Sequence, residues 1–489
     1  MPVNLLEQVV QIVTSAKRES TYIVAASDAP AHVIAQADYK CDGVADNVQI
    51  QAAIDALPAA GGGKIRLTQG TFNLAAALTA GGNTFLEGAG IESTTISVAD
   101  NVNGIVISEA STYGGGVKDL TLKVEGAAVI GISVSGVWKS CLESLKIEAK
   151  TASYATGIRI LSAAYLASIR NCRIIGFTTY GINLAANGCV VDNCDLIGIS
   201  GSKDIYVEST AQGCKILNNW LESASGRDVR HIQTEASYTI IYGNAIDGMY
   251  TAASIGVYIV GAGARNCLVV GNTFDFSKGV GIQIDTTAGE SNIIASNTFS
   301  TTTDSNAILV AKNNQTIDGN NIYISVADLG TAAVYLGANA HDIVVSNNTI
   351  KNTLANPDYG IYVGGLRAVI KGNIIDKWTY GISLAQAGSA AVIEGNNFLN
   401  MTTAGVDVPG NATVIHHNAG FVTENSGAST GTGAQQTIAH GLGFTPTRQR
   451  IALTAGSATA LPFHSADPDA TNIYVTAALN QPWYWARVG

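Results

Sequence analysis

Charged residues, cysteines and long apolar runs are scarce in this sequence, and each scarcity excludes a class of protein. Of the 489 residues only 13% are charged, whereas 47% are hydrophobic and 53 are glycine. This composition excludes a disordered tail and an ordinary charged helical protein. No run of 18 or more apolar residues is present, so the sequence predicts no membrane-spanning helix and no membrane partner.

Positive charge is also in short supply. Lys and Arg number 27 against 37 Asp and Glu, which gives a formal net charge of -10 at pH 7. A nucleic-acid-binding protein needs a surface that neutralises phosphates, so this balance disfavours DNA or RNA as a partner. A sugar polymer is compatible with it. The apolar stretch near the N-terminus precedes its charged residues, so we expect no ordinary secretion signal.

The 7 cysteines lack the spacing of a disulfide framework or a metal site, because no CxxC or Cys/His pattern occurs. We expect reduced, buried thiols that fill the core in columns, such as the column of Cys189, Cys214 and Cys267. The sequence predicts no cofactor and no metal site. His416 and His417, at the last repeat, are interpreted as structural.

What the sequence does contain is a repeat with a period of ~25 residues. A small residue followed by alternating aliphatic residues recurs, as in GINL at Gly181, GVYI at Gly256 and GIYV at Gly360. A second signal, Asn or Gly followed by an aliphatic residue or Phe, keeps the same phase, as in GNTF at Gly271. Short strands of one repeat cannot close a core, but stacked repeats share one. The sequence therefore predicts an all-β fold, a right-handed parallel β-helix with Asn side chains stacked at one turn.

Composition and periodicity divide the chain into four segments. Residues 1–39 are a short N-terminal helical segment with a lead-in, 40–423 the β-helix, 424–436 a linker, and 437–489 a small β-sandwich. The N-terminal apolar stripe suits either a short bundle between chains or packing on the β-helix. Asn47 is expected to cap a helix that covers the open end of the stack.

Two stretches resemble known proteins. The segment DGVADNVQIQAAIDALPAAGGGKIRLTQGTFNL, from Asp42 to Leu74, resembles the entry segment of pectate-lyase-like β-helix proteins. The segment TGTGAQQTIAHGLGFTPTRQRIALTAG, from Thr430 to Gly456, is similar to the tip of phage tail fibres. The resemblance implies a tailspike-like polysaccharide depolymerase, homotrimeric, carried on the virion and assembled in the host cytoplasm. An extracellular monomer of the pectate-lyase type is the alternative.

The family's catalytic motifs are missing, so the site must be inferred from the columns of the repeat. Neither the polygalacturonase-type set (NTD, DD, GHG and RIK) nor the DPHE signature of alginate epimerases occurs. We number the first residue of each GIxI-type strand position 0, and expect positions 0, 2 and 4 to point outward because alternate residues of a strand face opposite sides. The outward polar groups are then Asp204 and His231 at position 0, Tyr206, Gln233, Tyr258 and Gln283 at position 2, and Glu208, Glu235 and Asp285 at position 4.

Pairs of carboxylates predict glycoside hydrolysis, and Glu235 belongs to both candidate pairs. Glu208 lies one repeat away, at ~4.8 Å, which is near the carboxyl separation of retaining glycosidases. Asp285 lies two repeats away, at ~9.6 Å, which approaches the separation in inverting enzymes. A reserve column consists of Glu222, Asp247 and Asp275. Substrate binding is assigned to Tyr206, Tyr258, Gln233, Gln283, Asp204, Arg227, Arg230 and His231.

Other interpretations remain open. The carboxylates could be solvated surface, the tyrosines could pack between subunits, and His231 could fix a loop. Elimination by a lyase on a uronic acid polymer is the nearest chemical alternative, with a base among Arg227, Arg230, His231 and Tyr258. A non-catalytic adhesin or a structural virion fibre is the alternative from another class.

Overall fold

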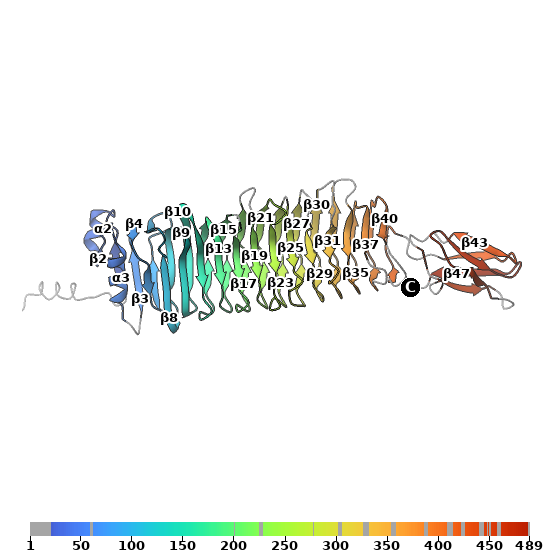
Figure 1. The fold of residues 1–489 in the computed structure, drawn as a ribbon, viewed down its shortest axis with the longest axis horizontal. Helices are drawn as coiled ribbons and strands as arrows, with labels where there is room; N and C mark the ends of the chain where they lie inside the picture. Colours follow the sequence, from blue (N-terminus) through green and yellow to red (C-terminus); the bar gives the residue numbers. More distant parts are fainter. Residues whose placement is uncertain are drawn as a thin grey trace, which may run out of the picture. The chain divides into compact units, whose positions relative to one another are not determined.

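The computed structural model describes residues 21–58, 62–199, 201–223, 228–276, 278–301, 306–325, 332–353, 358–385, 390–407, 414–421, 426–439, 445, 446, 448, 451–456 and 461–487. The N-terminal apolar stripe and Arg227 lie outside the described residues. The chain forms two compact units, residues 1–220 and 221–489. Both contain stacks of short parallel strands (Figure 1). The predicted all-β parallel solenoid is therefore confirmed.

The first unit begins with β1 (Thr21–Ala25), α2 (Ala31–Gln36), β2 (Tyr39–Lys40) and α3 (Asn47–Asp55). Helix α3 buries Ile50, Ala53 and Ile54, as their spacing predicts, and contacts strands β1 to β5. Asn47 is not the cap: Asp46 holds that position, and the Asn47 side chain accepts a hydrogen bond from the Ala75 amide at 3.0 Å. The described residues contain no helix long and apolar enough to cross a membrane.

The other strands of the first unit build its coils. They are β3 (Gly63–Leu67), β4 (Gly70–Leu74), β5 (Leu78–Ala80), β6 (Thr84–Glu87), β7 (Thr94–Val98), β8 (Ile105–Tyr113), β9 (Gly116–Trp138), β10 (Cys141–Ile160), β11 (Ser168–Arg170), β12 (Arg173–Ile175), β13 (Phe177–Leu184), β14 (Val190–Asp192), β15 (Asp195–Gly198), β16 (Lys203–Val207) and β17 (Lys215–Leu217). The boundary between the units falls in β18 (Trp220–Ser223).

In the second unit successive coils contribute their strands to three parallel sheets. The first sheet contains β19 (Arg230–Thr234), β22 (Ile255–Ile259), β25 (Val280–Ile284), β28 (Ile308–Val310), β31 (Ala332–Leu336), β34 (Tyr359–Val363), β37 (Tyr380–Leu384) and β40 (Ala404–Asp407). The second contains β20 (Ile240–Tyr242), β23 (Leu268–Val270), β26 (Ile293–Ala295), β29 (Thr316–Asp318), β32 (Val344–Ser346), β35 (Val369–Lys371), β38 (Val392–Glu394) and β41 (Val414–His416). The third contains β21 (Ala245–Met249), β24 (Thr273–Phe276), β27 (Thr298–Thr301), β30 (Asn321–Ile324), β33 (Thr349–Asn352), β36 (Ile374–Asp376) and β39 (Asn397–Leu399).

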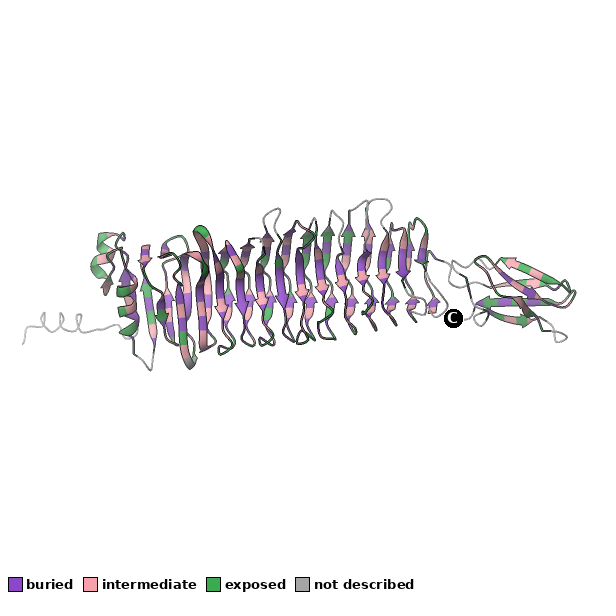
Figure 2. Ribbon diagram, viewed as in Figure 1, coloured by how far each residue is buried: buried purple, intermediate pink, exposed green. Residues whose placement is uncertain are grey.

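Successive coils pair in register, so equivalent side chains form columns. Ile232 pairs with Val257, which pairs with Ile282, and all three are fully buried. Phe274 and Phe299 stack in the same way, with ring centroids 4.7 Å apart. Figure 2 shows the buried residues recurring along the strands of each unit. Burial of these columns supplies the hydrophobic stabilisation that a single coil lacks.

The predicted Asn ladder is confirmed at the turn between the second and third sheets. The Asn297 side-chain oxygen accepts hydrogen bonds from the backbone and side-chain amides of Asn272, both at 3.0 Å. The Asn320 side chain does the same for Asn297 at 3.0 Å. The preceding residue has a left-handed backbone, with φ of 66° at Gly271 and 54° at Ser296. The Asn or Gly of the sequence signal therefore forms the turn, and the Asn that follows forms the ladder.

The cysteines are free thiols; six are buried and Cys141 is partly exposed. This confirms their interpretation as core residues. Cys172 and Cys194 occupy ladder positions, and the Cys194 amide donates to the Asn219 side chain at 2.9 Å. Cys267 belongs to another turn, where its amide donates to Asn292 at 2.9 Å.

The C-terminal segment forms two antiparallel sheets that share one core. The first is β42 (Ser426–Thr430), β47 (Pro482–Arg487) and β44 (Ile451–Ala455), and the second is β43 (Gln435–Ala439), β46 (Asn472–Thr476) and β45 (Phe463–Ala466). Ile451 and Trp483 of the first sheet pack in one cluster with Ile473 and Val475 of the second. Part of the predicted linker is a strand. Strand β42 lies within residues 424–436, and its Ser- and Gly-rich backbone pairs with β47. The four segment boundaries stay a prediction.

Candidate active site

Two polar columns run along the first sheet of the second unit. Gln233, Tyr258 and Gln283 pair directly across β19, β22 and β25. Two residues later in the same register come Glu235 and, two coils on, Asp285. Parallel in-register strands stack equivalent positions ~4.8 Å apart, so the predicted columns exist in this unit.

A chain of hydrogen bonds leads to Glu235. The Arg230 guanidinium donates from Nη1 to Oε1 of Gln233 at 3.2 Å, and the Gln233 amide Nε2 donates to Oε1 of Glu235 at 2.9 Å. Gln233 is 6% exposed, so its amide is covered and held between these two neighbours. Glu235 itself is partly exposed.

Asp285 is held by hydrogen-bond donors on both carboxylate oxygens. The Tyr258 hydroxyl donates to Oδ2 at 2.9 Å, and the Thr287 amide and hydroxyl donate to Oδ1 at 3.0 and 2.9 Å. Tyr258 also lies beneath the Arg230 guanidinium, whose carbon is 4.9 Å from the ring centroid. Arg230 therefore touches both branches, and we call Arg230, Gln233, Glu235, Tyr258 and Asp285 the carboxylate cluster.

Hydrogen bonds and burial set the protonation of Asp285 and Tyr258. Burial raises the pKa of Asp285. Hydrogen bonds from the Thr287 amide, the Tyr258 hydroxyl and the Thr287 hydroxyl together lower it by more, so the pKa lies below its ordinary value. Burial, followed by the hydrogen bond to Asp285, raises the pKa of Tyr258 to about 12. At neutral pH, Asp285 is thus a carboxylate and Tyr258 a neutral donor.

The outward direction predicted for position 0 is wrong. Asp204 and His231 are both 0% exposed. A Cβ placed on Gly256, the equivalent residue one coil after His231, would lie 2.9 Å from the Phe274 ring, so this position faces the interior at a corner of the coil. Burial leaves Asp204 and His231 no surface for a substrate. The recurrence of Gly at position 0 was the sequence signal that this position faces the interior.

The other predicted residues are spread over both units. In the first unit Tyr206 stacks on Tyr180 with centroids 5.1 Å apart, and the Lys203 ammonium lies 5.2 Å from its ring. Glu208 is partly exposed there, and its pairing with Glu235 stays a prediction. Gln283 is partly exposed in the second unit. Arg227, as noted, is outside the described residues.

The reserve column lies on the third sheet. Asp247 pairs with Asp275, which pairs with Ser300, as the repeat predicts. Asp247 is partly buried, Asp275 is exposed, and Glu222 is partly buried in β18. Their assignment as reserve catalytic residues stays a prediction.

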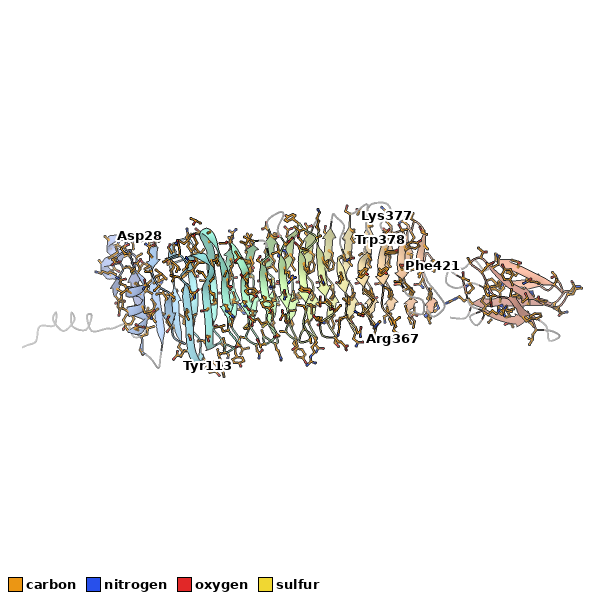
Figure 3. All side chains as sticks on the ribbon, viewed as in Figure 1. Asp28, Tyr113, Arg367, Lys377, Trp378 and Phe421 are labelled. Atoms are coloured by element: carbon orange, nitrogen blue, oxygen red, sulfur yellow. The ribbon has the colours of Figure 1, made fainter. Side chains whose placement is uncertain are left out.

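Sequence reasoning missed an aromatic hollow in the first unit. It has a volume of about 610 Å³ and is lined by Trp138, Tyr165, Leu166, Asn187, Gly188 and Gln212. Trp138 packs edge-to-face on Tyr165 at 5.6 Å and on Tyr113 at 5.0 Å. Tyr113 projects from the end of β8 (Figure 3) and is 53% exposed. Three aromatic residues contributed by separate coils therefore form one aromatic surface beside the hollow.

Sequence reasoning also missed a group of side chains that lie close enough together to hold a metal ion. Among the described residues, one such group occurs, formed by Glu394, His416 and His417, whose ligand atoms all lie within 4.8 Å of one another. None of these side chains belongs to the carboxylate cluster. The adjacent histidines were a visible signal, but their carboxylate partner is one coil earlier in the sequence.

Comparisons with known proteins agree with this architecture. The family model for a right-handed β-helix region matches residues 156–322 and 306–440. Mannuronan C5-epimerase AlgE6 of Azotobacter vinelandii is 43% identical over 97 residues, which cover 17% of this chain and 11% of the epimerase. A mutant tailspike protein of E. coli bacteriophage HK620, solved in complex with a pentasaccharide, has a TM-score of 0.53 at 15% identity; the match covers 91% of this chain and 90% of the tailspike.

Proposed function

The chain belongs to the right-handed β-helix family, and on that premise we propose that it binds a polysaccharide and hydrolyses its glycosidic bonds. The observation that carries the proposal is the pair of unlike carboxyl groups, Glu235 and Asp285, in one column. Asp285 is held as a carboxylate by Tyr258 and Thr287, while Glu235 accepts a single amide donor on Oε1. Glycosidases need such a division between an acid and a base or nucleophile.

The named relatives support a sugar polymer as the substrate. One acts on mannuronan, and the structure of the other holds a pentasaccharide. The net charge of -10 and the aromatic hollow fit the same class of ligand.

In the proposed mechanism the two carboxyl groups act on opposite sides of the bond. Glu235 protonates the leaving oxygen, and Gln233 holds its Oε1 so that the other oxygen faces the substrate. Asp285 takes a proton from the attacking water. A separation of two coils, ~9.6 Å, leaves room for that water and favours inversion at the anomeric carbon.

The lyase alternative is less well supported. Elimination from a uronic acid needs a base at its C5 proton. Tyr258 is a poor base because its pKa is raised to about 12 and its hydroxyl donates to Asp285, and His231 is fully buried.

Incubation of the purified protein with a panel of bacterial surface polysaccharides tests the proposal. Hydrolysis gives new reducing ends without the ultraviolet absorbance of an unsaturated uronate, whereas elimination gives that absorbance. Retained binding with neither product means a non-catalytic protein.

Replacing Tyr258 by Phe should move the acidic limb of the pH profile to higher pH. The variant loses one of the hydrogen bonds that lower the pKa of Asp285, so that pKa rises and the active carboxylate is lost at a higher pH than in the parent. Profiles of kcat/KM against pH measure the shift. Tyr335→Phe is the matched control, because Tyr335 shares the column but stacks on Tyr362 instead. An unmoved limb in Tyr258→Phe contradicts the role of Asp285.

A second candidate function, carbohydrate binding without cleavage, is favoured by the aromatic hollow. Trp138→Ala should weaken polysaccharide binding about tenfold, because burying a large apolar side chain contributes ~1.5–3 kcal/mol and ~1.4 kcal/mol corresponds to a factor of ten. Calorimetry with polymer and short oligosaccharides measures the loss. Tyr242→Ala, which removes a 51% exposed ring from the second unit, should bind like the parent. Equal affinity of the Trp138 variant excludes the hollow as a binding surface.

We also propose that the protein is a homotrimer and that it is carried on a virion. An outward column of Leu309, Tyr335 and Tyr362 is partly exposed on the first sheet, and such a column suits packing between subunits. The tailspike match supports the fold that these proposals presuppose.

A further inference from the structure

The last two described coils of the second sheet bring two imidazoles and a carboxylate together. Glu394 ends β38, His416 ends β41, and these residues pair directly. The Nδ1 atoms of His416 and His417 are 2.8 Å apart, and the Glu394 Oε1 lies 3.6 Å from the first and 3.9 Å from the second. Three ligand atoms from adjacent coils therefore converge on one point.

These distances fit a tetrahedral transition-metal ion. Zinc takes imidazole nitrogen and carboxylate oxygen at ~2.0–2.2 Å, which places its ligand atoms ~3.3 Å from one another in a tetrahedron. The observed separations lie on either side of that value, so small side-chain rotations suffice. Imidazole with carboxylate suits zinc, copper or nickel better than calcium or magnesium.

Position 417 is the turn position before a ladder Asn, and Gly, Asn or Ser occupies it in other coils. His417 has a left-handed backbone with φ of 53°, and the equivalent residues Gly372 and Gly395 are glycines at 66° and 63°. Among non-glycine residues, His adopts this conformation more readily than most, as Asn and Asp do. The His417 side chain places its Nδ1 beside that of His416.

The site is accessible to an ion from solvent. The side chains of His417, Glu394 and His416 are 68%, 46% and 20% exposed. Three protein ligands leave a fourth position for water, which is the pattern of an open zinc site. Strand β41 is the last described strand of the second sheet. It pairs with β38 on one side, and the outer strand of a sheet has no strand to pair with on its other side.

We propose that Glu394 Oε1, His416 Nδ1 and His417 Nδ1 bind one divalent transition-metal ion of the zinc type. The ion links β38 to β41 and resists fraying of the terminal strand. In the metal-free protein one Nδ1 donates its hydrogen to the other; on binding both Nδ1 atoms become ligands and both rings carry hydrogen on Nε2. The inference is independent of the glycosidase proposal.

Metal titration of the full chain tests the proposal. After treatment with a chelator, cobalt(II) chloride should bind one ion per chain with the visible absorption of a tetrahedral nitrogen and oxygen site, and zinc chloride should displace it. Thiolate-to-cobalt absorption would point to the partly exposed Cys141 and contradict the assignment. Zinc chloride should also raise the thermal midpoint of the chelated protein.

His417→Asn is the decisive variant, since Asn keeps the left-handed turn while removing a ligand. Its metal affinity should fall at least ~10-fold, with circular dichroism and metal-free stability unchanged. His32→Asn removes an exposed histidine from α2 and should bind cobalt like the parent. Failure of the parent to bind either ion in equilibrium dialysis, or equal affinity in His417→Asn, overturns the proposal.

Discussion

Asp285→Asn and Glu235→Gln should each lower polysaccharide turnover at least ~100-fold, the smallest contribution expected of a general acid or base. Both changes keep the size of the side chain and remove its titration. The expected loss lies in kcat, with binding of the polymer retained. Reducing-end release under saturating substrate measures it, and calorimetry checks the binding.

Asp247→Asn provides the matched control, because it makes the same change on the third sheet. It should keep activity if the carboxylate cluster is the site. Should both cluster variants keep more than about a tenth of the activity, the assignment fails. Loss of activity in Asp247→Asn would then move the site to the column of Asp247 and Asp275.

Asn297→Ala should destabilise the second unit by about 2–4 kcal/mol. The change removes the acceptor of the Asn272 backbone amide and the donor to the Val269 carbonyl, both within the buried ladder. A buried amide without a partner costs ~1–3 kcal/mol, and the cavity adds to it. Denaturant unfolding measures the loss, and faster hydrogen exchange at Asn272 locates it.

The neighbouring residue supplies the control. Ser296 is exposed and has φ of 54°, so Ser296→Gly should leave stability unchanged or raise it slightly. A ladder that contributes nothing would show equal stability in both variants.

The fold could be predicted because the repeat records it directly. A coil needs an aliphatic residue at each inward position and a left-handed residue before each ladder Asn, and Val257, Gly271 and Asn272 meet these demands in one coil. Local rules of this kind need no knowledge of distant contacts.

The site was predicted only in part, for physical reasons. The column of Glu235 and Asp285 could be predicted because a strand alternates its faces, but that rule fails at His231, which is buried although it lies in β19. The hydrogen bonds from Thr287 to Asp285 follow from a local turn that the column pattern does not describe. Glu394 and His417 meet through coil stacking, so neither residue identifies the other in the sequence.

The ladder also makes the chain modular. Gly271 precedes Asn-Thr-Phe at Asn272, and the same tripeptide begins again at Asn297. Excision of residues 272–296 would join Gly271 to Asn297 and recreate the junction residue for residue, with the same hydrogen-bond pattern above and below. Duplication of that stretch would do the reverse. A chain of this kind can therefore be lengthened or shortened in whole coils while the ladder keeps its hydrogen-bond pattern.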